Sequence, residues 1–473
     1  MNEAIGASAA LEAFARIVGA EHVVVDPEIF ADSLEEPRGL YHGKALALIR
    51  PASTAEVSAI LAYCSAAGVP VTPQGGNTGL VGGQTPDASG REIILSLKRM
   101  KRVREVDAAS DAMIVEAGVT LAEAQAAALA ADRLFPLSLA AEGTCTIGGN
   151  LSTNAGGVAV LAYGNARDLT LGVEVVLADG RIVNLLSKLR KDNAGYDLKD
   201  LFVGAEGTLG IVTAAALKLF PLPRSRAVAF VGLADPEKAV ALMRLARARR
   251  GQELVTFELL PRIGLDFALA YSRAARDPLG GRHRWYVLIE IASQATGGLD
   301  EALTELLGEA LEAGLIEDAS VAASLAQREA FWRIRETMPD AQKPQGGSIK
   351  HDVSTPLGAI PAFIAEATAA VEAFMPGARV VCFGHLGDGN LHFNVSQPVG
   401  ADQEAFLAQW TAMNAVVHAV VARFSGSFAA EHGVGRLKRA LLAETKDPAA
   451  LDLMRKIKAA LDPHGILNPG KVL

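Results

Sequence analysis

The stretch ALALIRPASTAEVSAILAYCSAAGVPVTPQGGNTGLVGG, residues 45–83, sets out the start of the fold in its order of apolar and glycine-rich segments. Residues 45–51 and 69–73 read as short extended strands, with a helix over residues 53–67 between them. Ser53, followed three residues later by Glu56, is a helix-capping signal, and Gly68 is a stop signal. A strand, a helix and a second strand are therefore expected to lead into the glycine loop at residues 74–83.

The glycine loop QGGNTGLVGG favours phosphate binding. Glycines let several backbone N–H groups converge on one anion without obstruction by Cβ atoms. The loop is not a Walker loop, since no Gly-Lys-Ser/Thr follows it, and it lacks the GxGxxG spacing of a nicotinamide site. A long turn between strands is the alternative interpretation of this loop by itself.

Two further glycine-rich stretches follow, EGTCTIGGNLSTNAGG at residues 142–157 and VGAEGTLGIVT at residues 203–213. Small residues and side-chain amides in an apolar setting allow a large planar ligand to approach the backbone. Three such stretches favour one extended cofactor, with a diphosphate and a ring system, over three unrelated structural turns.

The segment GHLGDGNLH, residues 384–392, predicts a metal-binding hairpin. If Asp388 and Gly389 form a two-residue turn, His385 lies directly opposite His392. Directly opposite residues have Cβ atoms about 4.5–5.5 Å apart on one face, so two imidazoles could share a divalent metal. Asn394 joins that face by alternation. Two surface histidines on a hairpin are the alternative.

The segment AEHGVG, residues 430–435, adds a carboxylate and a base in Glu431 and His432. Together with the hairpin histidines they would complete a two-His, one-carboxylate centre. Adjacent residues on a regular strand face opposite ways, so both can serve one site only on irregular backbone, which Gly433 and Gly435 permit.

Arg335 in WRIRE and Lys350 in SIKHDVS are candidate clamps for an acidic substrate, because a bidentate arginine plus a lysine suits a carboxylate. A solvated helix charge is the alternative for Arg335. His351 alternates out of phase with Lys350 and is expected to be structural.

Composition narrows the class of protein. The chain has 473 residues, a net charge of −8 and a pI near 5.7, which argue against nucleic acid or an anionic membrane as partner. No apolar run is expected to reach the roughly 18 residues of a membrane span, and the N-terminus lacks a signal-peptide pattern. Cys64, Cys145 and Cys382 lie far apart with no CxxC, which favours a reducing, cytoplasmic setting.

Pro221 and Pro223 punctuate the chain and predict a domain boundary. Beyond them, apolar segments and helices over 235–250 and 299–313 predict an antiparallel sheet with helices on one face. Helices over 403–424 and 436–460 follow. The predicted domains are 1–222, 223–420 and 421–473.

Taken together, these segments resemble the flavin-dependent D-2-hydroxyacid dehydrogenases, the D-lactate and D-2-hydroxyglutarate dehydrogenase group of the vanillyl-alcohol-oxidase-like FAD superfamily. The resemblance covers nearly the whole chain. It implies an α+β fold, with a two-subdomain FAD-binding domain, an antiparallel-sheet substrate (cap) domain and a helical C-terminal segment returning to the FAD domain. Its motifs are PQGGNTGLVGG, IGGNLSTNAGG, RKDNAGYDLKDLFVGAEGTLGIVT, GHLGDGNLHFNV, EHGVG and the terminal NPGK.

The resemblance also implies a cofactor site. Some superfamily members attach the flavin covalently to a histidine in the first loop; Asn77 stands in that region here, so a non-covalent FAD is expected. The implied FAD-binding residues are Pro73, Gly75, Gly76, Asn77, Thr78, Gly79, Gly82, Gly143, Thr144, Gly148, Gly149, Asn150, Thr153, Asn154, Gly156, Gly157, Glu206, Gly207, Ile211 and Asn468.

For catalysis, the resemblance implies oxidation of a D-2-hydroxy acid to the 2-oxo acid. A zinc-like metal would lower the pKa of the 2-hydroxyl, and hydride would pass to the flavin; a carbanion route with the same residues stays open. The implied roles are metal ligands for His385, His392 and Glu431, base for His432, clamps for Arg335 and Lys350, and substrate or metal-shell contact for Asn394.

One position departs from the hydroxyglutarate pattern. Those enzymes carry a threonine four residues after the clamp arginine, where this chain has Pro339, which has no donor. Gln342 or Lys343 could substitute. RKDNAGYDLK favours the hydroxyglutarate branch, whereas Pro339 favours D-lactate or another small acid.

Three other functions are compatible with parts of the sequence. They are a flavin-free metal hydrolase, a flavin-binding subunit of a glycolate-oxidase-like complex, and a lipid-synthesising transferase that uses FAD without net redox. The electron acceptor follows only by elimination: an electron-transfer flavoprotein, a quinone or a cytochrome. Oligomeric state is open, with a homodimer as one option.

Overall fold

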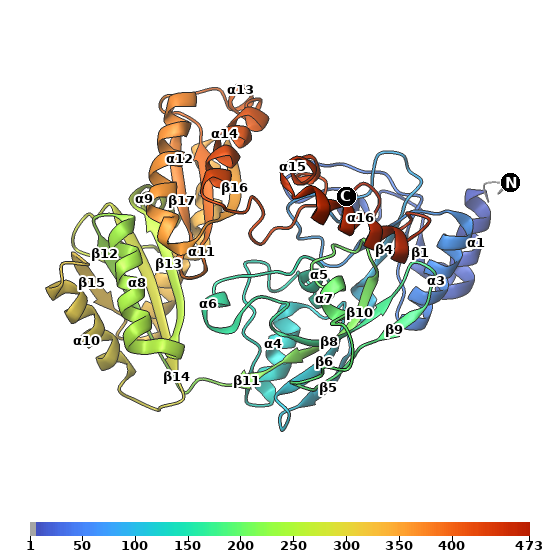
Figure 1. Ribbon diagram of the computed structural model, residues 1–473, viewed down its shortest axis with the longest axis horizontal. Helices are drawn as coiled ribbons and strands as arrows, with labels where there is room; N and C mark the ends of the chain where they lie inside the picture. Colours follow the sequence, from blue (N-terminus) through green and yellow to red (C-terminus); the bar gives the residue numbers. More distant parts are fainter. Residues whose placement is uncertain (1–5) are drawn as a thin grey trace. The chain divides into compact units, whose positions relative to one another are not determined.

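The computed structural model describes residues 6–473, which form two compact units (Figure 1). Unit 1 comprises the chain up to residue 156, residues 164–222 and residues 432–473; unit 2 comprises residues 157–163 and 223–431. The division after residue 222 coincides with the predicted boundary. The last division falls after residue 431 instead of 420, and the short piece 157–163 belongs to unit 2.

The first sheet of unit 1 holds the strand–helix–strand expected from residues 45–83. Its order is β1 (Val23–Val24), β2 (Ala47–Ile49), β4 (Ile93–Ser96) and β3 (Val71–Gln74), with β4 parallel to both β2 and β3. Between β2 and β3 lies α3 (Thr54–Ala67), against which α1 (Ala7–Val18) packs. The Ser53 side chain accepts from the Glu56 N–H, and Gly68 ends α3 at φ +67°, as predicted.

The second sheet of unit 1 is antiparallel and has the order β5-β6-β10-β8-β9. Two helices of unit 1 lie between β6 and β8 in the chain. The first, α4 (Leu121–Ala130), begins at a capping box on Thr120, and the second, α5, lies inside the second glycine-rich stretch. The bounds are β5 (Val103–Asp107), β6 (Ala112–Glu116), β10 (Ile211–Lys218), β8 (Thr170–Val176), β9 (Ile182–Asn184) and α5 (Ile147–Ser152).

Short elements complete unit 1. Strands β7 (Arg133–Leu134) and β11 (Phe220–Pro221) pair with each other, and α2 (Ala31–Leu34) and α7 (Lys199–Phe202) are single turns. The C-terminal segment carries α15 (Arg439–Thr445) and α16 (Pro448–Leu461) and then returns to β3, where the Asn468 N–H donates to the Val71 carbonyl.

Unit 2 is built on one seven-stranded sheet in the order β15-β12-β14-β13-β17-β18-β16, antiparallel throughout. The bounds are β12 (Ser225–Leu233), β13 (Leu254–Pro261), β14 (Trp285–Ser293), β15 (Asp318–Val321), β16 (Ser348–Ser354), β17 (Arg379–His385) and β18 (Asn390–Ser396). The sheet is antiparallel as predicted.

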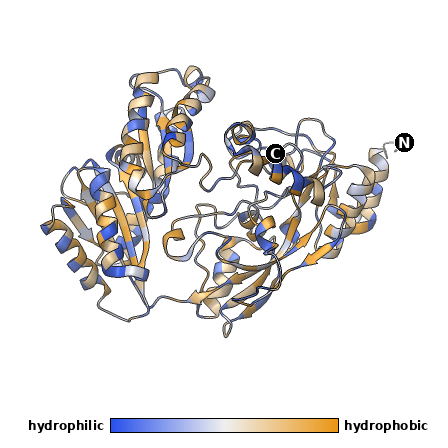
Figure 2. Ribbon diagram, viewed as in Figure 1, coloured by the Kyte–Doolittle hydropathy of each residue, from blue (hydrophilic) through white to orange (hydrophobic). Residues whose placement is uncertain are grey.

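Helices cover both faces of this sheet, so the prediction of helices on one face is wrong. On one face lie α8 (Pro236–Arg250), α10 (Leu299–Glu312), α12 (Ile360–Phe374) and α14 (Trp410–Arg423), and on the other lie α9 (Arg262–Tyr271) and α11 (Leu325–Ala341). The physical reason is that β12, β13 and β14 are apolar along nearly their whole length, visible as hydrophobic strands in Figure 2, so both faces require cover. Two short helices, α6 (Val160–Tyr163) and α13 (Gln403–Leu407), complete the unit.

One helical segment corrects the expectation about membrane spans. Leu357–Phe374 is long and apolar enough to cross a membrane by length and composition. In the structure this segment contains α12, whose apolar side chains join the core cluster against the sheet, as in the core helix of a globular unit; they are Ile360, Phe363, Ile364, Ala367 and Val371.

Candidate active site

In unit 1, the three glycine-rich stretches line one pocket, together with His432 and Asn468 from the C-terminal segment. Fourteen of the predicted cofactor residues line it: Pro73, Gly75, Gly76, Asn77, Thr78, Gly79, Gly148, Gly149, Asn150, Thr153, Glu206, Gly207, Ile211 and Asn468. The other six are absent from its lining: Gly82, Gly143, Thr144, Asn154, Gly156 and Gly157.

Close backbone packing explains why the first loop is glycine-rich. A Cβ atom added to Gly76 would lie 2.0 Å from the carbonyl oxygen of Thr144, and one added to Gly75 would lie 2.2 Å from Thr146 Oγ1. No atom lies within 4 Å of a Cβ added to Gly143. Gly75 and Gly76 are therefore required where two segments of the pocket meet, while Gly143 is not.

The same loop offers a cradle for an anion. Within residues 6–473, the backbone N–H groups of residues 75–79 donate to no protein acceptor. The Asn77 side chain ties the loop to residues 32–35, since its Nδ2 donates to the carbonyls of Asp32 (2.7 Å) and Glu35 (3.1 Å). Backbone N–H groups that have no acceptor in the protein, on a glycine loop, are suited to bind the pyrophosphate of a dinucleotide cofactor.

Glu206, which lines the pocket, also binds the backbone near the predicted base. Its two carboxylate oxygens accept from the backbone N–H groups of Val434 (2.7 Å) and Gly435 (2.8 Å). Burial raises the pKa of Glu206, and these two hydrogen bonds oppose that effect. Glu206 thus holds the loop that follows His432, the predicted base.

In unit 2, the histidine hairpin differs from the predicted register. Leu386–Asp388 form a 3-10 turn with Gly389 after it at φ +88°, and His392 lies opposite Phe383, not opposite His385. The Asp388 side chain stabilises the longer turn by accepting from the Asn390 N–H at 3.0 Å. The predicted two-residue turn and the direct pairing are therefore wrong.

The correction leaves both histidines on one face of the sheet. A shift of two residues preserves the alternation of side chains, so the pair becomes diagonal across the strands. The ring centroids of His385 and His392 lie 5.4 Å apart. Glu431 comes between them, with Oε1 3.7 Å from His392 Nε2 and Oε2 3.9 Å from His385 Nε2.

Asp352 joins this group and was missed in the sequence. It lies opposite His392 in the pairing of β16 with β18, and the ligand atoms of Asp352, His392 and Glu431 lie within 4.8 Å of one another. Its oxygens accept from Asn390 Nδ2 and from the Glu431 N–H, each at 2.9 Å. Its position two residues after Lys350 is the signal that could have found it.

The electrostatics of this group fit a cation. Burial and, against the lowering charge of His385, the neighbouring Asp352 and Asp388 together raise the pKa of Glu431 to about 7. Burial likewise raises the pKa of Asp388 to about 6. Acidic groups whose charged forms are this disfavoured would be stabilised by a divalent cation held by imidazole and carboxylate donors.

Glu258 in β13 is the second residue that the sequence did not indicate. It is fully buried, with Oε1 2.6 Å from His385 Nδ1 and Oε2 2.5 Å from Arg335 Nε. Burial would raise the pKa of Glu258, but the charges of His385 and Arg335 outweigh burial and lower it. Burial would lower the pKa of His385, but the charge and hydrogen bond of Glu258 outweigh burial and raise it. Within the apolar run LVTFELLP, a lone glutamate gave no pattern to detect.

The predicted clamps lie on the same face. Lys350 is opposite Asn394 in the register, and its Nζ lies 3.5 Å from the carbonyl oxygen of Pro339 in α11. Asn394 Nδ2 donates to Gln342 Oε1 at 3.1 Å, which places Gln342 beside the group.

Two residues lie apart from this group. Lys343, the other candidate substitute for the missing threonine, is exposed and pairs with Asp340. His351 lies on the opposite face of the sheet, where its Nδ1 bonds the Phe393 carbonyl.

Family models match both halves of the chain. The model described as "FAD binding domain" matches residues 45–186, and the one described as "FAD linked oxidases, C-terminal domain" matches residues 222–472. The chain is 37% identical over 465 residues to a mitochondrial D-2-hydroxyglutarate dehydrogenase of Arabidopsis thaliana, covering 97% of this chain and 80% of the relative. It is 39% identical over 480 residues to the Bos taurus protein of the same name, covering 98% and 83%.

The fold has relatives among solved structures as well. p-Cresol methylhydroxylase superposes with a TM-score of 0.77 at 17% identity, covering 98% of this chain and 96% of that protein. This likeness supports the expected vanillyl-alcohol-oxidase-type fold, and the sequence matches support an FAD-dependent oxidoreductase. The chain belongs to the family of FAD-linked oxidases that includes the D-2-hydroxyglutarate dehydrogenases.

Proposed function

We propose that the protein oxidises a D-2-hydroxy acid, with D-2-hydroxyglutarate as the first candidate, to the corresponding 2-oxo acid. The observation that carries the proposal is the sequence continuity of Glu431 and His432. Glu431 is one of the candidate metal ligands of unit 2, together with Asp352 and His392. His432, the next residue in the chain, lines the glycine-rich pocket of unit 1. The names of the similar dehydrogenases support the substrate class.

The residues of unit 2 bind and polarise the acid. Arg335 and Lys350 offer cations to the carboxylate. His385, His392 and Glu431 would hold a divalent metal, zinc being the first candidate, with Asp352 beside them. A metal at these donors would supply a Lewis acid for the 2-hydroxyl.

His432 takes the hydroxyl proton, and a bound flavin would supply the two-electron acceptor for the hydride that leaves C2. Glu206 keeps the loop of His432 in place through Val434 and Gly435. The loop at residues 75–79 would hold the cofactor by its pyrophosphate, without a covalent bond, since Asn77 uses its side chain to fix the loop.

Gln342 is the proposed substitute for the missing threonine. It is buried and bonded to Asn394 on the substrate-binding face, whereas Pro339 contributes no donor. D-Lactate is the second candidate, since it has no distal carboxylate to hold. A cytoplasmic location is proposed because the three cysteines are unpaired and buried.

An anaerobic half-reaction tests the proposal. The purified protein is mixed with D-2-hydroxyglutarate, D-lactate and their L-isomers, and the visible absorbance of the flavin is followed. We expect bleaching with a D-acid alone. A colourless protein, or no bleaching with either D-acid, contradicts the proposal, and bleaching that survives verified metal removal contradicts the role of the metal.

A quinone, a cytochrome and an electron-transfer flavoprotein are the proposed acceptors. Each is added in turn to the bleached enzyme, and recovery of the flavin absorbance identifies the one that serves.

A further inference from the structure

A single buried carboxylate joins two parts of the proposed site. Glu258 faces His385 in the pairing of β13 with β17, and its Oε1 lies 2.6 Å from His385 Nδ1. Its Oε2 lies 2.5 Å from Nε of Arg335 on α11. One oxygen therefore serves a candidate metal ligand, and the other serves a candidate carboxylate clamp.

The bond to His385 selects the tautomer that can bind a metal. A carboxylate only accepts hydrogen bonds, so Nδ1 of His385 carries the proton that it shares with Glu258. In the neutral ring the lone pair then resides on Nε2, the atom that lies 3.9 Å from Glu431 Oε2. A metal-binding histidine oriented by a carboxylate on its other nitrogen follows the same physical logic.

The bond to Arg335 sets the plane of the guanidinium. Because the group is planar, fixing Nε directs its two terminal nitrogens. The Phe383 ring supports it from one side, with Arg335 Cζ 4.9 Å from the ring centroid. Phe383 is also the residue opposite His392, so the clamp and the second histidine share one support.

We infer that Glu258 is a positioning residue that couples the metal ligand to the substrate clamp. The inference rests on the proposed function. It extends that function to a residue that lies within an apolar strand of the core. Replacing Glu258 by glutamine leaves one accepting oxygen and puts an NH2 against the second donor, so one partnership is lost. Metal affinity and substrate affinity are expected to fall together.

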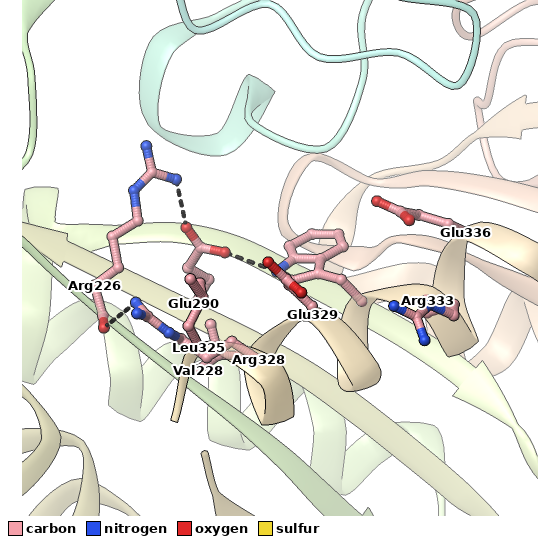
Figure 3. A pocket seen from close by; sticks show the side chains of 9 residues that line it. Arg226, Val228, Glu290, Leu325, Arg328, Glu329, Arg333 and Glu336 are labelled. Atoms are coloured by element: carbon pink, nitrogen blue, oxygen red, sulfur yellow. Dashed lines mark hydrogen bonds and ion pairs between the residues drawn. The ribbon is translucent and has the colours of Figure 1, made fainter. Parts of the chain in front are cut away.

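Unit 2 contains a matched control on the same face of the sheet. Glu290 in β14 is also a buried carboxylate between two donors, Arg226 Nη1 at 3.0 Å and Trp332 Nε1 at 2.8 Å. Figure 3 shows its pairing with Arg226. Neither donor belongs to the proposed site. Glu290→Gln therefore makes the same chemical change at a comparable burial without touching His385 or Arg335.

The experiment measures binding of Zn²⁺ alone to the full-length, metal-free flavoprotein by competition with a chromophoric chelator. It also measures the dissociation constant of D-2-hydroxyglutarate from anaerobic flavin titrations. For Glu258→Gln we expect the Zn²⁺ affinity to fall about 10- to 100-fold, and the dissociation constant of the acid to rise by roughly tenfold, the effect of losing one charged hydrogen bond. For Glu290→Gln we expect both constants within about threefold of wild type, the size of a minor context effect.

Glu258→Asp serves as a second variant if the glutamine protein does not fold. Aspartate keeps the charge but is one methylene shorter, so it is expected to reach only one of His385 and Arg335. The affinities for Zn²⁺ and for the acid should then fall by unequal amounts. The inference would be overturned if both Glu258 variants bound Zn²⁺ and the acid with the dissociation constants of the wild type. It would also be overturned if Glu290→Gln lost as much affinity for both as Glu258→Gln. A wild-type protein that binds neither Zn²⁺ nor a D-2-hydroxy acid instead overturns the proposed function, and the inference with it.

Discussion

The pocket of unit 1 and the polar face of unit 2 are constructed in opposite ways. The pocket is made largely of backbone, from glycine loops such as residues 75–79, whose N–H groups donate to no protein acceptor within residues 6–473. The polar face of unit 2 is made of side chains that five elements bring together from distant parts of the chain: β13, α11, β16, β17 and β18. Backbone sites depend on having no side chain, whereas the sheet face depends on strand register.

This difference predicts how each region responds to substitution. Adding one methyl group should ruin the pocket, because its loops approach each other at backbone distance. Removing one side chain should ruin the sheet face and leave the fold and the pocket intact. Flavin content and metal content are thus separate readouts of the two regions.

The largest effect is expected from Gly76→Ala. Its Cβ would lie 2.0 Å from a main-chain oxygen, that of Thr144, which cannot move without moving the second glycine stretch. We expect the purified variant to contain less than about a tenth of the wild-type flavin, since close approach of backbone to ligand is lost. The flavin-to-protein absorbance ratio measures it.

Gly143→Ala is the matched control for this variant. Gly143 is a glycine of the neighbouring stretch with no atom within 4 Å of an added Cβ. Its flavin content should equal that of wild type. Equal flavin loss in both variants would show that close packing of the first loop is not what builds the pocket.

The next largest effect is expected from His392→Ala, which breaks the sheet face alone. Loss of a metal ligand removes Lewis-acid stabilisation worth several kcal/mol, so kcat with D-2-hydroxyglutarate should fall by roughly a thousandfold or more. The bound metal should fall with it, while the flavin-to-protein ratio stays at the wild-type value. Elemental analysis and stopped-flow bleaching provide the two measurements. A variant that keeps its metal and its rate would remove His392 from the site.

The sequence was sufficient for whatever depends on local pattern. The capped helix after Ser53, its glycine stop, the loop at residues 74–83 and the antiparallel character of unit 2 could all be predicted, because capping, periodicity and glycine clustering act over a few residues. The resemblance to a known family supplied the cofactor.

Register and long-range pairing could not be predicted in this way. The hairpin at Asp388 and Gly389 acquired a longer turn, since a side chain stabilised a 3-10 turn that competes with the two-residue loop. Asp352 and Glu258 reach the site only through pairing with strands far along the chain. A glutamate inside an apolar run carries no local signal of its partners, so side-chain sites on sheets are the harder part to predict.

Pro339→Thr adds a hydrogen-bond donor to the polar face of unit 2. Threonine restores a backbone N–H inside α11 and places a hydroxyl four residues after Arg335. A new hydrogen bond to a charged carboxylate contributes about 1.5–3 kcal/mol, so the ratio of kcat/KM for D-2-hydroxyglutarate over D-lactate should rise about 10- to 100-fold. Lys343→Ala, at an exposed residue paired with Asp340, should leave the ratio unchanged.

The outcome of this substitution also tests Gln342. If Gln342 already holds the distal carboxylate through its place beside Asn394, the added hydroxyl gains little in Pro339→Thr. Gln342→Ala should then lower the same ratio. A ratio unmoved by either change would mean that the natural substrate has no distal carboxylate.

The smallest effect is expected from Glu206→Gln, where a side chain of the pocket holds backbone. The amide can accept from only one of the Val434 and Gly435 N–H groups, which costs about 1–3 kcal/mol. The melting temperature should fall by about 2–4 °C for each kcal/mol lost. The rate of bleaching should fall more than the affinity for the acid, because the loop that carries His432 loses one of its two hydrogen bonds to Glu206.

The pH dependence separates this charge effect from simple packing. Burial raises the folded-state pKa of Glu206 above its ordinary value of 4.5, so the folded state binds the proton more tightly than the unfolded state. The stability owed to this group is therefore fully present below pH 4.5 and is lost as pH rises through the raised pKa. The wild-type melting temperature, measured relative to that of Glu206→Gln, should accordingly decrease as pH rises from 4.5 through the raised pKa. A difference between the two proteins that stays constant with pH would mean that Glu206 acts through its shape alone.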